Sequence, residues 1–168
     1  MPEKITVAER GRLIEFSFGD MLRYAGPYSP AGVANAFKVL QRAIAVLSPD
    51  TPVARRSIVI RTAFAGPGAQ DGFEAVTRAV SDGRYTVDAA LARPDLGRRR
   101  QNFVFEVGTG GRTVTLVLRE GFVTDEFIDL AGNNQRTAEE ESRLDALKSQ
   151  LAERVMAARA GAVYDVAN

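Results

Sequence analysis

The chain has 168 residues, of which 45% are hydrophobic and 26% charged, so one domain (residues 1–168) with an ordinary core is expected. Its 22 lysines and arginines nearly balance 21 acidic residues, and the net charge of +1 gives no general attraction for nucleic acid or an anionic membrane. Neither cysteine nor histidine occurs, which excludes Ser-His-Asp and Cys-His catalysis, thiol redox chemistry and zinc sites built from Cys or imidazole.

We therefore predict no metal site and no cofactor, although carboxylates alone could still hold a metal. The first residues lack an apolar signal region, and no apolar run approaches the length of a bilayer span. A cytoplasmic location with no membrane partner is the expectation.

The N-terminal part of the chain predicts a lead-in and a short helix. Residues 3–18 alternate apolar and polar side chains around Gly11, which favours frayed or strand-like structure. Residues 18–26 carry apolar side chains at helical spacing and end at Gly26 with a proline behind it, which indicates a short helix with a stop signal.

The next elements are a long helix and a strand. Ser29 precedes Pro30, as an N-cap residue precedes proline at the first helical position, and apolar residues at helical period predict a helix over 31–47. After a break at 48–52, the stretch RRSIVIRTAF predicts a strand whose Ile58–Ile60 segment is buried on both faces.

A second turn rich in glycine, residues 65–72, again precedes a helix. Phe73 and Val76 lie on one face of this helix, which is expected to end near Gly83. Residues 84–101 are polar and rich in arginine, and predict a long loop with at most one short element.

The last third of the chain predicts a hairpin and two helices. Residues 102–122 form two alternating runs around the turn GTGG, and the stretch TDEFIDL predicts a short helix. Thr137 and Glu140 form a capping box that opens a final helix over about 138–159, with a leucine stripe. The order of elements predicts an α+β fold: a small mixed, largely antiparallel sheet covered by helices.

The first turn, which contains Tyr24, Tyr28 and Ser29, has two interpretations. Free amides and the positive end of the dipole at a helix start bind anions, and the three hydroxyls could add donors. Alternatively, Ser29 only caps the helix and the tyrosines pack in the core.

The second turn contains Gly68, Gln70 and Asp71. Its glycines allow close backbone approach, and Asp71 could be a helix cap, a metal-binding carboxylate or a general base. The turn lacks the Lys-Ser/Thr ending of a phosphate-binding P-loop.

Two other features also have competing interpretations. Arg93 and Arg98–Arg100 could bind phosphate or nucleic acid, but a solvated loop is favoured because the chain is nearly neutral and has no RNA-binding signature. The leucine stripe of the last helix could bind a partner or cover the chain's own sheet.

The two turns together, YAGPYSPAGVANAFKVLQRAI and FAGPGAQDGFEAVTRAVSDGRYTVD, followed by FVFEVGTGGRTVTLVLREGFV, resemble the FmdE family, which takes its name from a component of formylmethanofuran dehydrogenase. The resemblance covers about residues 15–130 and leaves out the helix at 137–160. It implies a helix-strand-helix-then-strands core, related to the C-terminal catalytic domain of glyceraldehyde-3-phosphate dehydrogenase, and commonly a homodimer. A rival resemblance to formaldehyde-activating enzyme has the wrong spacing.

The resemblance also implies where a metal would be bound in the family. Ala25 and Pro27 stand where the family has histidines, Ser29 stands where it has its first cysteine, and Gly68 stands near its second. Pro30, Asp71 and Thr77 match the family pattern. The scaffold is therefore expected without its soft-metal ligands.

These observations lead to one preferred function and two alternatives. The preferred function is metal-independent binding of a small polar or anionic molecule where turns 24–31 and 65–72 meet. One alternative is an enzyme of one-carbon or pterin-related metabolism with Asp71 as base and a tyrosine as acid. The other is a structural component of a larger complex that docks through its C-terminal helix. The predicted binding residues are Tyr24, Tyr28, Ser29, Gly68, Gln70, Asp71 and Tyr85.

Overall fold

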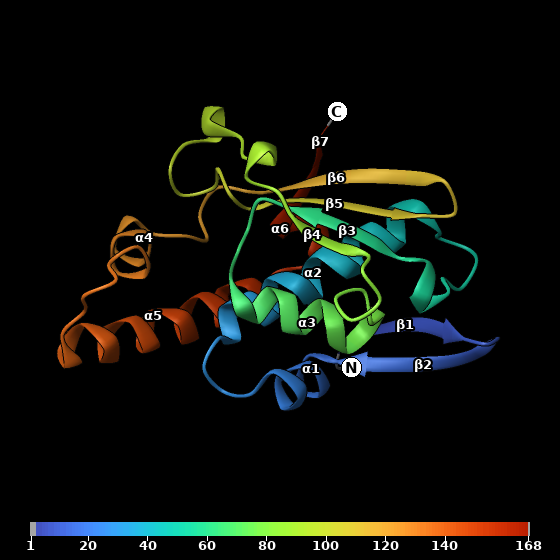
Figure 1. Cartoon of the computed structure of the whole chain (residues 1–168), viewed down its shortest axis with the longest axis horizontal. Coiled ribbons are helices and arrows are strands. Elements are labelled where there is room, and N and C mark those ends of the chain that lie inside the picture. Colours follow the sequence, from blue (N-terminus) through green and yellow to red (C-terminus); the bar gives the residue numbers. More distant parts are fainter. Residues whose placement is uncertain (1–2, 168) are drawn as a thin grey trace.

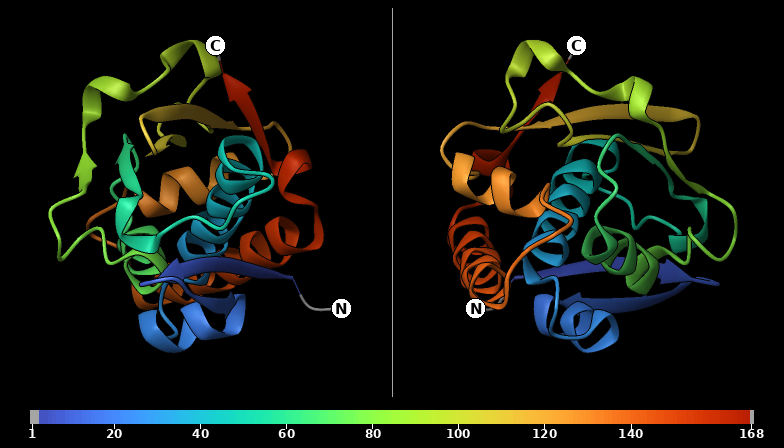
Figure 2. Two further views of the ribbon diagram at one scale, coloured as in Figure 1. Left: turned by 90° about the vertical axis from the view of Figure 1, so that its right-hand side faces the viewer. Right: turned by 60° about the vertical axis from the view of Figure 1, so that its left-hand side comes forward.

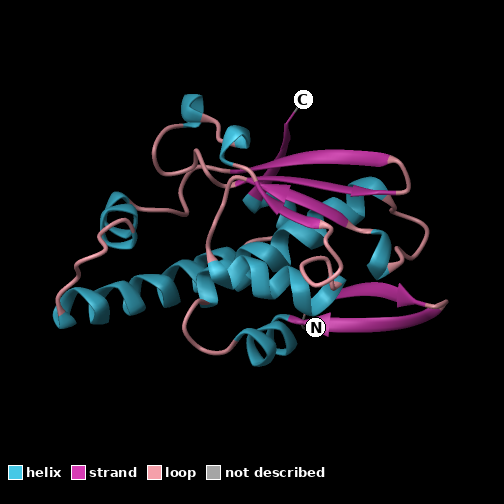
Figure 3. Ribbon diagram, viewed as in Figure 1, coloured by secondary structure: helices cyan, strands magenta, loops and turns pink. Residues whose placement is uncertain are grey.

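The computed structural model describes residues 3–167, which form an α+β fold with a five-stranded and a two-stranded sheet. The larger sheet covers one side of a layer of helices, and a β-hairpin with a short helix lies on the other side (Figures 1 and 3). The predicted fold class is confirmed, including the largely antiparallel sheet.

The chain begins with an antiparallel hairpin of β1 (Lys4–Glu9) and β2 (Arg12–Ser17). Arg10 and Gly11 form the turn with positive φ angles of 49° and 80°, which a tight hairpin turn between right-handed twisted strands requires. The strand-like lead-in predicted from alternation is therefore confirmed as a hairpin.

Two helices follow, α1 (Phe18–Ala25) and α2 (Pro30–Leu47), close to their predicted bounds. Every residue of 31–40 is buried, because α2 runs between the large sheet and the hairpin (Figure 2). Polar residues inside this helix therefore need partners, and the Lys38 ammonium donates to Glu3 at 2.5 Å.

Ser29 occupies the N-cap position of α2, but its hydroxyl makes no capping hydrogen bond. Its backbone has φ −138° and ψ 54°, outside the β-region geometry from which an N-cap side chain normally reaches the next amides. Ser29 is therefore the N-cap residue before Pro30, as predicted, but the expectation that its side chain caps the helix is wrong.

The large sheet has the strand order β4-β3-β5-β6-β7. Only β3 and β4 are parallel, and all other neighbours are antiparallel. The strands are β3 (Val59–Thr62), β4 (Tyr85–Val87), β5 (Val104–Thr109), β6 (Arg112–Leu118) and β7 (Tyr164–Ala167). The expectation that β3 is buried on both faces is wrong: Ile60 is fully buried but Val59 is 45% exposed, because helices cover only one face.

Helix α3 (Pro67–Thr77) is shorter than predicted. It ends at Arg78, whose backbone is left-handed at φ 60°, rather than near Gly83. Gly66 is the N-cap residue, so Asp71 lies within the helix and the predicted capping role of Asp71 is wrong.

The connections are mostly irregular, with three short 3₁₀ helices. These are η1 (Arg55–Ser57), η2 (Ala89–Leu91) and η3 (Pro94–Leu96). Since β4, η2 and η3 all lie within residues 84–101, the expectation of a long loop with at most one short element is wrong.

The C-terminal part contains α4 (Asp125–Ala131), α5 (Ala138–Ala157) and α6 (Ala160–Val163). The capping box of Thr137 and Glu140 is present, as predicted. The leucine stripe of α5 is buried and α5 packs against α2, so the stripe covers the chain's own core. Neither α6 nor β7 was predicted from the sequence.

Candidate ligand-binding site

The starts of α2 and α3 lie directly against each other, so the two turns meet as expected. A Cβ atom placed on Gly68 would lie 2.6 Å from the Ser29 Cβ and would also clash with the Ser29 carbonyl. A Cβ on Gly32 would lie 2.6 Å from the Ala69 nitrogen. Only glycine permits this approach, which brings both helix N-termini to one place.

A cavity of about 280 Å³ opens beside this crossing. The starts of α2 and α3 form one part of its wall. The segment after β3, the segment before β5, and the α4–α5 region form the rest. The apolar side chains in the lining are Ala31, Phe64, Pro67, Phe103, Phe127, Ala131, Leu144 and Leu151. The polar side chains are Ser29, Asn35, Arg136 and Lys148, and none of the acidic residues within 3–167 lines the cavity.

Backbone donors face this region from both helices. Proline occupies the first helical position of each, and neither N-cap side chain makes a hydrogen bond. Within residues 3–167, the amides of the lining residues Ala31, Gly32 and Gly68 donate to no acceptor. Free amides and the positive ends of two helix dipoles favour a negatively charged group.

Two cationic side chains add positive charge at the edge of the cavity. The Lys148 ammonium, on α5, donates to the Tyr28 carbonyl at 3.3 Å and so lies beside the start of α2. Arg136 donates to Glu141 at 2.9 Å and to the carbonyls of Leu130 and Asn133 at 3.0 and 2.8 Å. Its guanidinium is thereby fixed between α4 and α5.

Asn35 is the buried polar residue of the lining, with 1% of its surface exposed. Its Nδ2 donates to the Ala31 carbonyl at 2.8 Å, and its Oδ1 accepts from the Tyr164 hydroxyl at 2.6 Å. Burial raises the pKa of Tyr164 well above its ordinary value, so the phenol remains a donor to Asn35 at neutral pH.

Of the predicted site residues, only Ser29 and Gly68 line the cavity. Tyr24, near the end of α1, and Tyr28, in the α1–α2 turn, are 59% and 80% exposed and do not line the cavity. The expectation that they pack in the core or line the pocket is wrong. Gln70 and Asp71 lie further along α3, because this helix already begins at Pro67.

Tyr85 also lies outside the cavity lining. It belongs to β4, and its ring packs against Phe73 with centroids 5.8 Å apart. Its hydroxyl is buried and has no hydrogen-bond partner among the described residues, and burial raises the pKa of Tyr85 to about 12.

Sequence reasoning missed most of the residues that do line the cavity. Arg136 and Lys148 are more than 100 residues from Ser29 in the chain, so no local pattern connects them. Asn35 carried a usable signal, since it is a polar residue in a helix segment that is otherwise mostly apolar.

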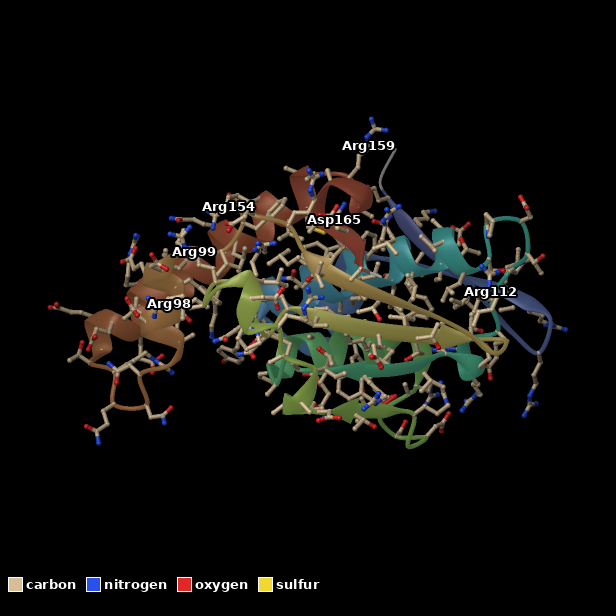
Figure 4. The ribbon with its side chains drawn as sticks, turned by 90° about the horizontal axis from the view of Figure 1, so that it is seen from above. Arg98, Arg99, Arg112, Arg154, Arg159 and Asp165 are labelled. Atoms are coloured by element: carbon tan, nitrogen blue, oxygen red, sulfur yellow. The ribbon has the colours of Figure 1, made fainter. Side chains whose placement is uncertain are left out.

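The arginine loop is held by acidic neighbours. Arg98 pairs with Asp129 at 2.5 Å and Arg99 pairs with Asp125 at 3.0 Å, which joins the loop to α4 (Figure 4). Arg93 pairs with Asp95 at 2.8 Å, and Arg100 lies 3.6 Å from Glu120. These pairs favour the solvated-loop interpretation.

Within residues 3–167, no group of three or more His, Cys, Asp or Glu side chains is arranged to hold a metal ion. In the same range, no helix has both the length and the apolar character to cross a bilayer. No protein-family model matches the chain, and no curated protein matches it significantly. The resemblance to the FmdE family therefore stays a prediction.

Proposed function

We propose that this protein binds a small organic anion in the cavity at the starts of α2 and α3. The observation that carries the proposal is that the polar groups lining the cavity include free amides from two helix N-termini and the cations Lys148 and Arg136, the latter paired with Glu141. Among residues 3–167, no carboxylate belongs to the lining. The apolar remainder of the wall suits a hydrocarbon part of the ligand. The volume of 280 Å³ is slightly below the usual range of ligand pockets, about 300–1,000 Å³, and so favours a small molecule.

Binding is favoured over catalysis because Asp71, the candidate base, does not line the cavity. Docking through the C-terminal helix is disfavoured because the apolar stripe of that helix is already buried within the chain.

Titration of ¹⁵N-labelled protein with 2-naphthoate, octanoate and phenyl phosphate tests the proposal by NMR. At least one of these anions should shift the amide signals of Ala31, Gly32 and Gly68 saturably. Lys148→Glu places a carboxylate at the cavity edge and should weaken that binding by about tenfold or more.

Arg159→Glu is the matched control, because it changes the net charge equally at a residue that projects from the edge of the molecule (Figure 4) and does not line the cavity. It should leave the affinity within about twofold, since exposed distant charges are screened by salt. If no anion gives saturable shifts, or if both variants weaken binding equally, anion binding in this cavity is refuted.

A further inference from the structure

We infer that the cavity selects a flat aromatic monocarboxylate, and that Asn35 is the side chain that recognises its carboxylate. The inference rests on the proposed function and specifies the chemical class of its ligand. Three features of the lining support it. They are the aromatic walls, the two cationic side chains whose N–H groups are already partly hydrogen-bonded, and the buried side-chain amide of Asn35.

Aromatic rings form much of the apolar wall. Phe64 and Phe103 lie with ring centroids 4.7 Å apart and an interplanar angle of 31°, and Phe127 contributes a third ring from α4. Aromatic side chains pair best with other rings in offset or edge-to-face arrangements. A flat ring system therefore fits this wall better than a flexible chain, which would also lose conformational entropy on binding.

The cations in the lining suit a single negative charge. Lys148 already donates to the Tyr28 carbonyl, and the Nε and Nη1 groups of Arg136 are occupied by Glu141 and by two carbonyls. A phosphate dianion would need more free charged donors than remain, because each buried charge must be paired and hydrogen-bonded. A carboxylate can be satisfied by the free helix amides together with one side-chain donor.

Asn35 supplies that donor. A carbonyl oxygen can only accept, so the Ala31 carbonyl determines that Nδ2 faces it, and the Tyr164 hydroxyl occupies Oδ1. One Nδ2 hydrogen then has no acceptor among the described residues, although Asn35 is only 1% exposed. A buried NH₂ group with one of its two hydrogens still unpaired favours a ligand that brings an acceptor, and disfavours analogues that do not.

The test compares 2-naphthoate with octanoate, phenyl phosphate and the neutral 2-naphthamide on the intact protein by NMR titration. 2-Naphthoate should bind at least about tenfold more tightly than each of the others, which corresponds to one charged hydrogen bond or one well-packed ring. In the wild-type protein, 2-naphthoate should also shift the side-chain NH₂ signals of Asn35.

The variant Asn35→Asp replaces the donor by an acceptor and should reduce 2-naphthoate affinity by about tenfold or more. The wild-type NH₂ signals provide the same information if this variant does not fold. If octanoate or phenyl phosphate binds more tightly than 2-naphthoate, the inferred preference for an aromatic monocarboxylate is wrong, although anion binding is upheld. Unmoved Asn35 signals in the 2-naphthoate complex would overturn the role of Asn35. No saturable binding of any anion would refute the proposed function itself.

Discussion

The fully buried Tyr164 and the half-buried Tyr85 both have buried hydroxyl groups, but only one of these groups has a hydrogen-bond partner. The Tyr164 hydroxyl donates to Asn35 at 2.6 Å, while the Tyr85 hydroxyl is buried without a partner among the described residues. A buried hydrogen bond contributes modestly to stability, but a buried polar group left without a partner has a larger cost. The phenol oxygen therefore stabilises the protein at one position and not at the other.

Replacing each tyrosine by phenylalanine should reveal this difference. Tyr164→Phe leaves the Asn35 Oδ1 buried without a donor and should lower the free energy of unfolding by about 1–3 kcal/mol. Tyr85→Phe removes only an unpartnered hydroxyl and should change the free energy of unfolding by less than about 1 kcal/mol, or increase it. Urea unfolding measures both, and equal losses would contradict the assignment of partners.

The pH dependence of the same variants checks the burial of Tyr85. The folded-state pKa of about 12 exceeds the ordinary value of 10.0, so the folded protein holds this proton more tightly than the unfolded chain. The resulting stabilisation is complete below pH 10 and is lost as the pH rises from about 10 to 12. The free energy of unfolding should therefore decline less between pH 10 and about 12 for Tyr85→Phe than for the wild type.

At the scale of elements, the crossing of α2 and α3 positions the site. Gly68 contacts Ser29 so closely that an added Cβ would lie 2.6 Å from the Ser29 Cβ. Gly72 continues the contact one turn later, because its Cβ would lie 2.9 Å from that of Ala36. The glycines of the second turn serve close helix packing rather than a phosphate-binding loop.

Gly68→Ala should force the two helix starts apart and lower the free energy of unfolding by about 1–3 kcal/mol, as overpacked substitutions do. Gly19→Ala in α1 is the matched control, since its Cβ would meet only ordinary contacts at 3.6 Å. That change should stabilise the protein by about 0.5–1 kcal/mol through helix propensity. Urea unfolding measures the stability of both variants. If Gly68→Ala leaves the free energy of unfolding unchanged, the close contact between α2 and α3 is contradicted.

Local signals predicted most individual elements. The Thr137–Glu140 capping box, the periodic apolar residues of α2 and the alternating runs of the β5–β6 hairpin each depend on neighbours within a few residues. The errors occurred where distant contacts decide. Val59 is 45% exposed on the face of β3 opposite the buried Ile60. Helix α3 ends at Arg78, where the distant Arg55 donates to the carbonyls of Ala75 and Val76 in the last helical turn.

At the scale of the whole molecule, the C-terminal segment completes the large sheet. β7 pairs with β6 from Thr115 to Leu118, and it carries the fully buried Tyr164. The ring of Tyr164 packs edge-to-face on Phe105 at 5.7 Å. The last strand in sequence thus supplies a central part of the core and supports Asn35 in the cavity.

Removal of residues 159–168 should therefore destabilise the entire fold. Loss of the Tyr164 side chain alone has the size of a large-to-small core substitution, about 3–5 kcal/mol. Thermal unfolding followed by circular dichroism should show a strongly lowered midpoint or no cooperative transition. A shortened chain that unfolds cooperatively near the wild-type temperature would contradict this role.

The sequence by itself determined the class of fold, the positions of most helices and strands, and the absence of cysteine and histidine chemistry. It also located Ser29 and Gly68 at two turns that meet. Only the tertiary structure decided which side chains share the cavity, because Asn35, Phe64, Arg136 and Lys148 reach it from α2, the end of β3, the α4–α5 loop and α5. Patterns within a helix or turn report on nearest neighbours, whereas a cavity is formed by segments brought together through burial of the whole core.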